Sequence, residues 1–317
     1  MTRSLSHALD SLLAEAYRAA GDAFRSVDRL TGYRIERFRF RRKNGYPLDL
    51  AVPQSLNQKI TWKKIHDRNP LLPVATDKLR VREYVRSILG DEEADRILIP
   101  VLFSGTEPRD IPFDSLPEEY VIKTNHGSGM VIVVRAGEPF DRKKTERKLR
   151  RWLRMTWGAF THQWAYLSIP KRVLVEPLLL DEDGNLPRDF KFHMFNGACR
   201  FIQVFYPSGD NSRSAFDAEW RFLDIGSRGL WRDGQEMPPP ENLPEMLRIA
   251  ERLARDFEYV RVDLYSIGKR IYFGELTAYP SNGGNAIDPV SMDFKLGSYW
   301  DIVLGYWLRS AAPDSVS

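Results

Sequence analysis

Two carboxylates and one guanidinium occupy alternate positions in neighbouring segments near the C-terminal end. Residues 259–265 alternate between apolar and polar side chains, which predicts a strand with Arg261 and Asp263 on its polar face. A second alternating segment predicts the return strand, where Glu275 and Thr277 share one parity. If the connecting loop has an odd number of residues, all four side chains line one face. Two carboxylates so placed need a counter-charge: either a hard cation such as Mg²⁺, bound together with phosphate oxygens and water, or an ordinary ion pair with Arg261.

Lysines and a glycine-rich segment supply what would bind a polyphosphate beside such a cation. Lys123 lies on a predicted strand just before Asn125–Gly129, whose two glycines allow the backbone to fold closely over an anion and present its N–H groups. Lys191 lies between two phenylalanines on another predicted strand, and Lys78 is expected to open a helix, where the helix dipole favours phosphate. A hairpin with an ordinary Gly/Ser-rich tip is the alternative interpretation of Asn125–Gly129. Together, the three lysines, the flexible segment and the two carboxylates are what a magnesium–nucleotide site requires.

The elements that must position these residues alternate between hairpins and helices. Helices are expected up to about residue 30 and at 56–67, 78–89, 141–160 and 242–257. Strands are expected at 34–43, 97–103, 120–124, 130–134, 172–180, 189–195, 200–206, 259–265 and 270–277. The dipeptide Asn196-Gly197 is a strong signal for a hairpin between two of these strands. Antiparallel hairpins interleaved with helices predict an α+β fold rather than a doubly wound parallel sheet.

The composition excludes several classes of protein. Of the 317 residues, 43% are hydrophobic and 28% are charged, which rules out a disordered or collagen-like chain. The single cysteine, Cys199, excludes a disulfide scaffold and a thiolate zinc site within one chain, so a reducing cytoplasm is the expected compartment. No apolar run reaches the roughly 18 residues that a membrane span needs, and the N-terminal helix is expected to be amphipathic and packed on the protein. The net charge of +4 permits anionic partners, although no nucleic acid is expected among them.

Two basic segments each have two interpretations. Residues 34–43 are expected to form a strand with a solvated basic face, or else a surface that binds an anionic polymer. The basic helix around residues 142–154 is expected to carry a solvated face, or else to dock an acidic glycan or anionic lipid headgroups.

Several short motifs occur in one order along the chain, and together they resemble the ATP-grasp proteins. They are Asn57–Trp62, Arg68–Pro70, Asp77-Lys78, Val121–Gly129, Leu174–Glu176, Asp189–Lys191, Val260–Asp263 and Gly274–Thr277. More narrowly, the sequence resembles the TupA-like ATP-grasp family, named for teichuronopeptide synthesis, from about Pro47 to Gly297. The resemblance implies two α+β lobes that clasp the nucleotide. We expect a helical and extended N-terminal segment at 1–76 and an ATP-grasp domain at 77–317, with lobes at about 77–170 and 171–317.

The resemblance also implies the parts of a site for ATP and Mg²⁺. The nucleotide would contact Lys78, Lys123, His126, Gly127, Ser128, Gly129, Met130, Glu176, Leu178, Leu179 and Lys191. In this set the lysines hold phosphates, Gly127–Met130 closes over them, and Glu176 to Leu179 form the adenine hinge. The metal ligands would be Asp263, Glu275 and Thr277, with Thr277 where ATP-grasp enzymes at large have Asn. Arg261 and Lys191 would act on the transferred phosphoryl group. The loop after the metal strand is expected to hold the acceptor through Ser281, Asn282 and Gly283.

The implied activity is that of an ADP-forming carboxylate–amine ligase. Its substrates would be an amine and a carboxylate from a uronic-acid glycan, an amino acid or a peptide, in polysaccharide or peptide-conjugate biosynthesis. A kinase that phosphorylates a hydroxyl acceptor and a non-catalytic nucleotide- or glycan-binding module remain as alternatives. The region before Lys78 is shorter than the usual N-terminal domain of such ligases, so the resemblance does not identify the residues that form the acceptor pocket.

Overall fold

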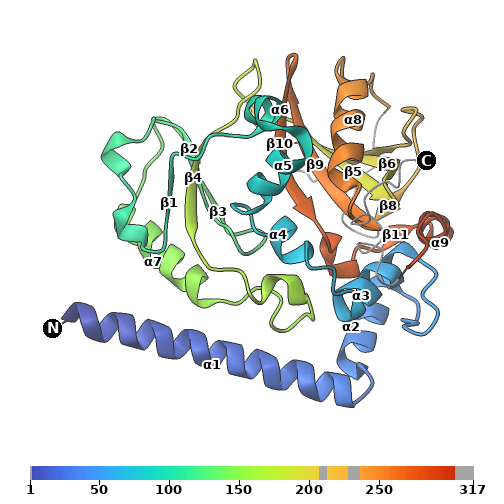
Figure 1. The fold of residues 1–317 in the computed structure, drawn as a ribbon, viewed down its shortest axis with the longest axis horizontal. Coiled ribbons are helices and arrows are strands. Elements are labelled where there is room, and N and C mark those ends of the chain that lie inside the picture. Colours follow the sequence, from blue (N-terminus) through green and yellow to red (C-terminus); the bar gives the residue numbers. More distant parts are fainter. Residues whose placement is uncertain (1, 207–212, 228–235, 304–317) are drawn as a thin grey trace, which may run out of the picture. The chain divides into compact units, whose positions relative to one another are not determined.

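The computed structural model describes residues 2–206, 213–227 and 236–303 of the chain. The described residues form two compact units, shown with their helices and strands in Figure 1. The first unit comprises Met1–Glu36, Asp77–Leu79 and Ile99–Leu178, and the second comprises Arg37–Thr76, Arg80–Leu98 and Leu179–Ser317. No helix among the described residues is long and apolar enough to cross a membrane.

The first unit is built on a four-stranded antiparallel sheet in the order β1-β4-β2-β3. Its strands are β1 (Phe103–Gly105), β2 (Tyr120–Thr124), β3 (Val131–Val134) and β4 (Val173–Pro177). Helix α7 (Arg142–Arg154) packs Leu149 into a core with Ile122 and Val175. Because strand side chains alternate between faces, Lys123 and Glu176 lie on the face of the sheet opposite this core. Short 3₁₀ helices lie at η1 (Pro108–Asp110), η2 (Phe113–Ser115) and η3 (Trp164–Tyr166).

A long helix, α1 (Thr2–Leu30), begins the first unit and contacts α7. The expected helix is therefore confirmed, and Tyr17, Phe24 and Arg25 contact residues 159–162. Leu12 and Leu13 are 62% and 45% exposed, whereas Gly21 and Asp28 are buried. A Cβ at Gly21 would lie 2.7 Å from that of Ala159, so the glycine permits the close approach of the helix to residues after α7. The N-terminal helix was expected to pack on the protein through its apolar face, and this expectation is wrong for positions 12 and 13.

The second unit is built on a five-stranded antiparallel sheet in the order β10-β9-β5-β6-β7. The strands are β5 (Asp189–Phe195), β6 (Ala198–Phe205), β7 (Arg213–Phe216), β9 (Tyr259–Ile267) and β10 (Arg270–Thr277), and β8 (Gly226–Ser227) pairs separately with β11 (Ile287–Asp288). The β5–β6 hairpin turns at Asn196 and Gly197, both of which have positive φ, as a type I′ turn requires. Helix α8 (Leu243–Ala254) covers one face of β5, β6 and β9 (Figure 1). The opposite face carries the polar residues.

The remaining helices of the second unit surround this sheet. They are α3 (Leu56–His66), α4 (Leu72–Thr76), α5 (Val81–Leu89), α6 (Asp91–Ile97), η4 (Pro280–Gly283) and α9 (Val290–Gly297). Helix α3 begins at a capping box in which Ser55 and Gln58 exchange hydrogen bonds. It contacts both α9 and η4, and thereby ties the acceptor loop expected from the sequence to the body of the unit.

Several expected elements differ from the structure. The strand expected at 34–43 is wrong, because this segment is helix α2 (Arg34–Asn44), which buries Glu36, Phe40 and Asn44 at helical spacing. The helix expected at 78–89 begins only at Val81, so Lys78 does not lie at a helix N-terminus. The strand expected at 97–103 is instead the end of α6 followed by a loop and the short β1.

The helix expected at 141–160 ends at Arg154, and the strand expected at 172–180 is only β4. Strand β4 pairs with β2 and clusters with the first unit, whereas part of the 1–76 segment clusters with the second. The lobe boundaries given from the sequence therefore stay a prediction.

We predict that Gly297→Ala destabilises the second unit. A Cβ at Gly297 would lie 2.0 Å from the carbonyl oxygen of Gln54 and 2.6 Å from the carbonyl carbon of Ser55, both of them backbone atoms before α3. Overpacking of this kind typically costs about 1–3 kcal/mol, and we expect the free energy of unfolding measured in urea to fall by about this amount. Gly226→Ala is the matched control, because its nearest contact would be an ordinary 3.8 Å. Equal stability of the two variants would contradict the prediction.

Candidate active site

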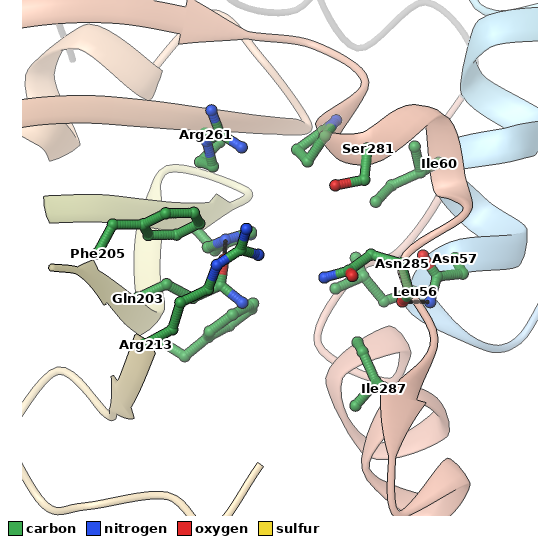
Figure 2. A pocket seen from close by; sticks show the side chains of 13 residues that line it. Leu56, Asn57, Ile60, Gln203, Phe205, Arg213, Arg261, Ser281, Asn285 and Ile287 are labelled. Atoms are coloured by element: carbon green, nitrogen blue, oxygen red, sulfur yellow. Dashed lines mark hydrogen bonds between the residues drawn. The ribbon is translucent and has the colours of Figure 1, made fainter. Parts of the chain in front are cut away.

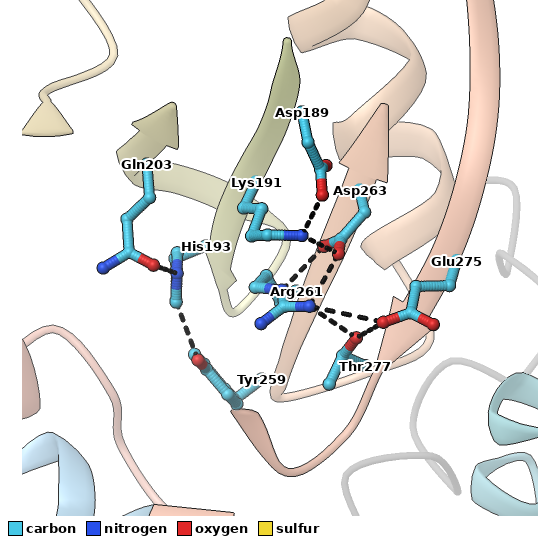
Figure 3. A network of polar contacts seen from close by, with 9 residues as sticks. All are labelled: Asp189, Lys191, His193, Gln203, Tyr259, Arg261, Asp263, Glu275 and Thr277. Atoms are coloured by element: carbon cyan, nitrogen blue, oxygen red, sulfur yellow. Dashed lines mark hydrogen bonds and ion pairs between the residues drawn. The ribbon is translucent and has the colours of Figure 1, made fainter. Parts of the chain in front are cut away.

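A charged network lies on the polar face of the second unit's sheet (Figure 3). Asp263 is at its centre: its Oδ2 accepts hydrogen bonds from Lys191 Nζ at 2.7 Å and from Arg261 Nη2 at 2.6 Å. Its Oδ1 accepts a third from Arg261 Nε at 2.6 Å. Arg261 Nη2 also lies 3.0 Å from the Thr277 hydroxyl and 3.4 Å from Glu275 Oε1. All four residues expected on one face of this hairpin therefore meet there.

The strand register produces this convergence. Thr277 pairs with Arg261, and Glu275 pairs with Asp263. The loop between β9 and β10 has only two residues, Gly268 and Lys269, so the odd loop that the sequence argument required is absent. A β-bulge between Phe273 and Glu275 shifts the register by one and restores the like-parity pairing.

Strand β5 adds a third column of side chains to the same face. Lys191 lies directly opposite Asp263, and His193 lies opposite Arg261. Asp189 also accepts a hydrogen bond from Lys191 Nζ. Lys191 is 7% exposed, and its ammonium lies 4.7 Å from the centre of the Phe205 ring. The two carboxylates thus hold the lysine at a fixed position on a largely apolar strand.

Burial and charge pairing shift the pKa values of Asp189 and Arg261 in opposite directions. Burial raises the pKa of Asp189 to about 6, although the adjacent Lys191 ammonium lowers it. Burial acts to lower the pKa of Arg261, but the carboxylate of Asp263 outweighs it and the pKa is raised. Arg261 is therefore a permanent cation.

The oxygen atoms of Asp263, Glu275 and Thr277 fit the donor preference of Mg²⁺. Mg²⁺ uses one or two carboxylates and completes its shell with phosphate oxygens and water, and these three side chains supply hard oxygen donors on one face. The Thr277 hydroxyl donates to Glu275 Oε1 at 2.9 Å, so it is oriented toward the second carboxylate. Within the described residues there is no group of three or more His, Cys, Asp or Glu that could hold a metal by itself.

In the first unit, Lys123 and Lys78 occupy different places around the glycine-rich loop. Lys123 Nζ lies 2.5 Å from Glu176 Oε2, an ion pair between neighbouring strands. Lys78 Nζ donates to the carbonyl oxygen of Gly127 at 2.8 Å. Both lysines and Glu176, three of the residues expected to contact nucleotide, thus lie in one unit. Leu178 follows β4, with its N–H 3.4 Å from the carbonyl oxygen of Glu119, and Leu179 is the next residue in the chain.

The base of the glycine-rich loop is held by Asn125, whose role the sequence argument missed. Its side-chain amide donates to Asp77 Oδ1 at 2.9 Å and to the carbonyl oxygen of Pro170 at 2.8 Å, and its Oδ1 accepts from the N–H of Arg172 at 2.7 Å. Asn125 therefore joins three chain segments beneath the loop. Asp77, Pro170 and Arg172 are distant from Asn125 along the chain, so no local pattern in the sequence identifies this anchor.

The glycine-rich loop is exposed at its tip and packed into the unit at its end. Gly129 has a φ of +71°, and a Cβ at Gly127 would lie 3.0 Å from Met130 Sδ. Met130 is only 4% exposed, so this end of the expected lid is packed into the unit. Ser128 is exposed at the tip of the loop.

His126 is buried against the end of α7 rather than displayed on the loop. Its Nε2 lies 3.3 Å and 3.2 Å from the carbonyl oxygens of Trp152 and Met155. Burial, reinforced by the charge of Lys171, lowers the pKa of His126 to about 4, so the ring is neutral at pH 7 and donates from Nε2. The structure gives this side chain an anchoring contact, and its contact with phosphate stays a prediction.

The acceptor loop expected from the sequence has a strained backbone. Ser281 and Asn282 have φ values of +48° and +58°, and Gly283 follows at +67°. Consecutive left-handed residues other than glycine are costly and persist only where the surroundings impose them. Here the carbonyl and side-chain oxygens of Asn282 accept from Lys64 Nζ at 3.2 and 2.9 Å, and Asn44 donates to the carbonyl oxygen of Gly283 at 3.0 Å.

A pocket opens between this loop and the polar face of the sheet, entirely within the second unit (Figure 2). It contains about 390 Å³ of empty space, part of it open to solvent. Ser281 and Arg261 line it, whereas Asn282 and Gly283 do not. The Asn282 side chain is instead bound to Lys64. Asn282 and Gly283, which were expected to contact the substrate, thus hold the loop in place without lining the pocket.

Comparison with known families identifies the fold to which this site belongs. Residues 58–301 match the model of the TupA-like ATP-grasp family. The chain belongs to this family. The expected membership of the TupA-like ATP-grasp family and the expected α+β fold are thereby confirmed. A search of curated protein sequences found no significant match.

Solved structures similar to the TupA-like chain include three ligases. D-alanine–D-alanine ligase from Bacillus anthracis shares 14% identity at a TM-score of 0.42, over 71% of this chain and 67% of that one. Phosphoribosylamine–glycine ligase from Thermotoga maritima shares 8% identity at a TM-score of 0.41, over 70% of this chain and 55% of that one. The third is the ATP-grasp ligase PsnB, solved with a phosphomimetic variant of its minimal precursor, Mg and ADP. It shares 11% identity at a TM-score of 0.37, over 73% of this chain and 60% of that one. The TupA-like chain thus spans about two thirds or less of the length of each.

Sequence reasoning missed the part of the site that comes from β5, β6 and β7. His193, Gln203 and Arg213 all line the pocket on the same face as Arg261. The sequence analysis gave none of these three residues a role. The alternation of residues 201, 203 and 205 is a signal for a shared face, but the pairing of β6 with β7 joins segments that local patterns do not connect.

We predict that His126 makes the stability of the TupA-like protein depend on pH. Its pKa is about 4 when folded and 6.5 in the reference state, so between these values the unfolded chain binds the proton more tightly. The free energy of unfolding should therefore fall as the pH is lowered from 6.5 toward 4, by at most about 1.4 kcal/mol per pH unit for this group. Urea unfolding between pH 7 and 5 should show a shallower slope in His126→Gln than in the wild type. Identical slopes would show that the group is not buried and neutral.

Proposed function

We propose that this TupA-like protein is an ATP-dependent carboxylate–amine ligase that forms an amide through an acyl phosphate. The observation that carries the proposal is the face made by Arg261, Asp263, Glu275 and Thr277, within a chain of the ATP-grasp family. Its carboxylates suit a hard cation and its guanidinium suits an anion, which is the pair of needs that phosphoryl transfer presents. The acceptor would be the carboxylate of a uronic-acid glycan, an amino acid or a peptide, in polysaccharide or peptide-conjugate biosynthesis in the cytoplasm.

The residues divide between holding nucleotide and holding metal. Lys78, Lys123 and the backbone of 127–130 would bind phosphate oxygens, and Glu176 to Leu179 would contact the adenine. Bound Mg²⁺ would neutralise charge on the transferring phosphoryl group, and Asp263, Glu275 and Thr277 would hold it. Lys191, fixed by Asp189 and Asp263, would hold a phosphate oxygen without needing to be reoriented.

In the proposed reaction, an oxygen of the acceptor carboxylate attacks the γ-phosphorus and the bond to the β-phosphate oxygen breaks, which releases ADP. The acyl phosphate then receives the lone pair of the amine at its carbonyl carbon, the amine loses a proton, and inorganic phosphate leaves. Arg261 would stay protonated throughout, because Asp263 raises the pKa of this group, and would donate to the phosphoryl oxygens as charge develops on them.

A kinase that transfers the phosphoryl group to a hydroxyl is the second candidate, because a nucleotide site does not specify its acceptor. The arginines that line the pocket favour the ligase, since an anionic acceptor needs cationic groups and a hydroxyl acceptor does not. A non-catalytic sensor is disfavoured, because the charged groups of the proposed site are all present.

We expect Asp263→Asn and Lys123→Ala each to weaken ATP binding in the presence of Mg²⁺ by about tenfold or more. Charge-assisted hydrogen bonds to phosphate and metal ligation are each worth roughly 1.5–3 kcal/mol. Isothermal calorimetry measures the effect, with the exposed substitutions Asp183→Asn and Lys143→Ala as controls and thermal unfolding to verify the fold. Equally tight binding by all five proteins would refute the nucleotide site.

Hydroxylamine should separate the ligase from its rivals. An acyl phosphate is trapped as a hydroxamate, whereas a phosphorylated hydroxyl is stable and a sensor releases no ADP. We therefore expect ADP and hydroxamate to appear together when uronic acids or amino acids are added with ATP and Mg²⁺. ADP release only with hydroxyl acceptors that lack a carboxylate would replace the ligase by the kinase.

A further inference from the structure

The pocket of the second unit is lined by two arginines and by no carboxylate. Among its 13 lining residues, Arg213 and Arg261 are charged, Gln203 and Ser281 are polar, and Leu56 and Ile60 contribute apolar surface (Figure 2). A site built for an ammonium group would need an anion within reach, and none of the lining residues supplies one. Asp263 pairs with Arg261, so Arg213 is the lining residue whose positive charge favours a negatively charged molecule.

Arg213 is held in place by the sheet. It begins β7, pairs with Phe205 on β6, and stacks its guanidinium over the Phe205 ring at 3.9 Å. Stacking keeps the planar group in one orientation. Burial, reinforced by the charge of Arg261, lowers the pKa of Arg213 to about 10, so both groups are cations at pH 7. An anion in the pocket would relieve their mutual repulsion.

Gln203 is oriented by a chain of buried hydrogen bonds (Figure 3). His193 Nε2 lies 3.1 Å from Gln203 Oε1, and His193 Nδ1 lies 2.8 Å from the Tyr259 hydroxyl. Burial lowers the pKa of His193, so the ring is neutral and carries one proton. Because Gln203 Oε1 can only accept, that proton is on Nε2, and Tyr259 donates to Nδ1. The amide nitrogen of Gln203 points away from His193 and offers its two N–H groups as donors.

The other walls give the pocket its size and its rigidity. Leu56 and Ile60 lie on α3, whose start is bound to α9 through Asn57: its N–H donates to Asp293 Oδ1 at 3.0 Å. The side-chain amide of Asn57 donates to Asp293 Oδ2 at 2.7 Å and to the carbonyl oxygen of Asn285 at 2.9 Å. A molecule in the pocket would thus meet anion-binding donors on the sheet side and a fixed apolar surface on the helix side.

We infer that this pocket binds the carboxylate acceptor, with Arg213 forming the ion pair that selects it and Gln203 donating to its oxygens. The inference rests on the proposed ligase function and narrows it: the molecule held here is a small organic acid whose uncharged part packs on Leu56 and Ile60, not the amine. Arg213 is then a specificity-determining residue, separate from the residues that would hold ATP and metal.

The test is direct binding of defined probes by calorimetry, without ATP. D-Glucuronate and L-glutamate represent the sugar and amino-acid forms of an acid, and D-glucose and D-glucosamine are the neutral and cationic controls. We expect at least one acid to bind the wild type, to bind Arg213→Gln about tenfold or more weakly, and to bind Arg213→Lys with intermediate affinity. Arg221→Gln, which removes an exposed arginine of the same unit, should bind like the wild type. Thermal unfolding and an unchanged Kd for ATP verify that the variants are folded.

Three results would overturn the inference: no acid binds the wild type, glucose or glucosamine binds as tightly as the acids, or Arg213→Gln binds the acid as the wild type does. Failure of the proposed function has a different signature. If an acid binds in an Arg213-dependent manner but releases no ADP from ATP and Mg²⁺ with hydroxylamine present, the anion site stands and the ligase does not. If ADP is released and Arg213→Gln leaves the KM for the acid unchanged, the ligase stands and the assignment of Arg213 falls.

Discussion

The bond between Asp263 and its two cations is the constraint on which the second unit's site depends. Asp263 is 2% exposed, and a carboxylate so buried is tolerated only when it is paired and hydrogen-bonded. Arg261 and Lys191 satisfy it, and Glu275 and Asp189 in turn balance these cations. Removing one member would leave the others buried and uncompensated, whereas apolar residues of similar volume would often be as stable. Stability alone therefore does not explain the network, whereas the phosphoryl transfer proposed for this face would require these charges.

In the loop expected to hold the acceptor, a backbone conformation that costs stability fixes the position of a side chain. Ser281 and Asn282 adopt left-handed conformations that favour glycine, and Lys64 holds Asn282 there from α3. Gly283 completes the turn because a Cβ would lie 2.4 Å from Thr61 Oγ1 and 2.8 Å from the carbonyl oxygen of Asn57. The strain fixes Ser281 against the pocket, as expected where a backbone must present one side chain at a defined point.

Sequence patterns predicted what local geometry determines and failed where distant segments pair. Alternation placed Arg261 and Glu275 on their strands, and the Asn196-Gly197 turn located the β5–β6 hairpin. The bulge beside Gly274 was not foreseen, because a glycine within a strand has several meanings, yet it determines which residues face each other. Ile35, Phe38 and Phe40 fit a strand as well as a helix, and only the burial of Glu36, Phe40 and Asn44 distinguishes them. Arg213 escaped notice because nothing near it in the sequence shows that β7 lies beside β6.

Across the polar face of the sheet, the charge changes sign from one edge to the other. Glu275 on β10 and Asp263 on β9 form an acidic side, Lys191 on β5 stands between, and Gln203 on β6 and Arg213 on β7 form a side of donors. A cation would be stabilised at the first side and an anion at the second, and Arg261 on β9 binds Asp263 through its guanidinium while also lining the pocket. An antiparallel sheet with this register holds both at fixed spacing without any loop having to move. In the proposed site, the order of the strands would therefore separate the metal from the acceptor, and the same order would bring both onto the face that Arg261 shares.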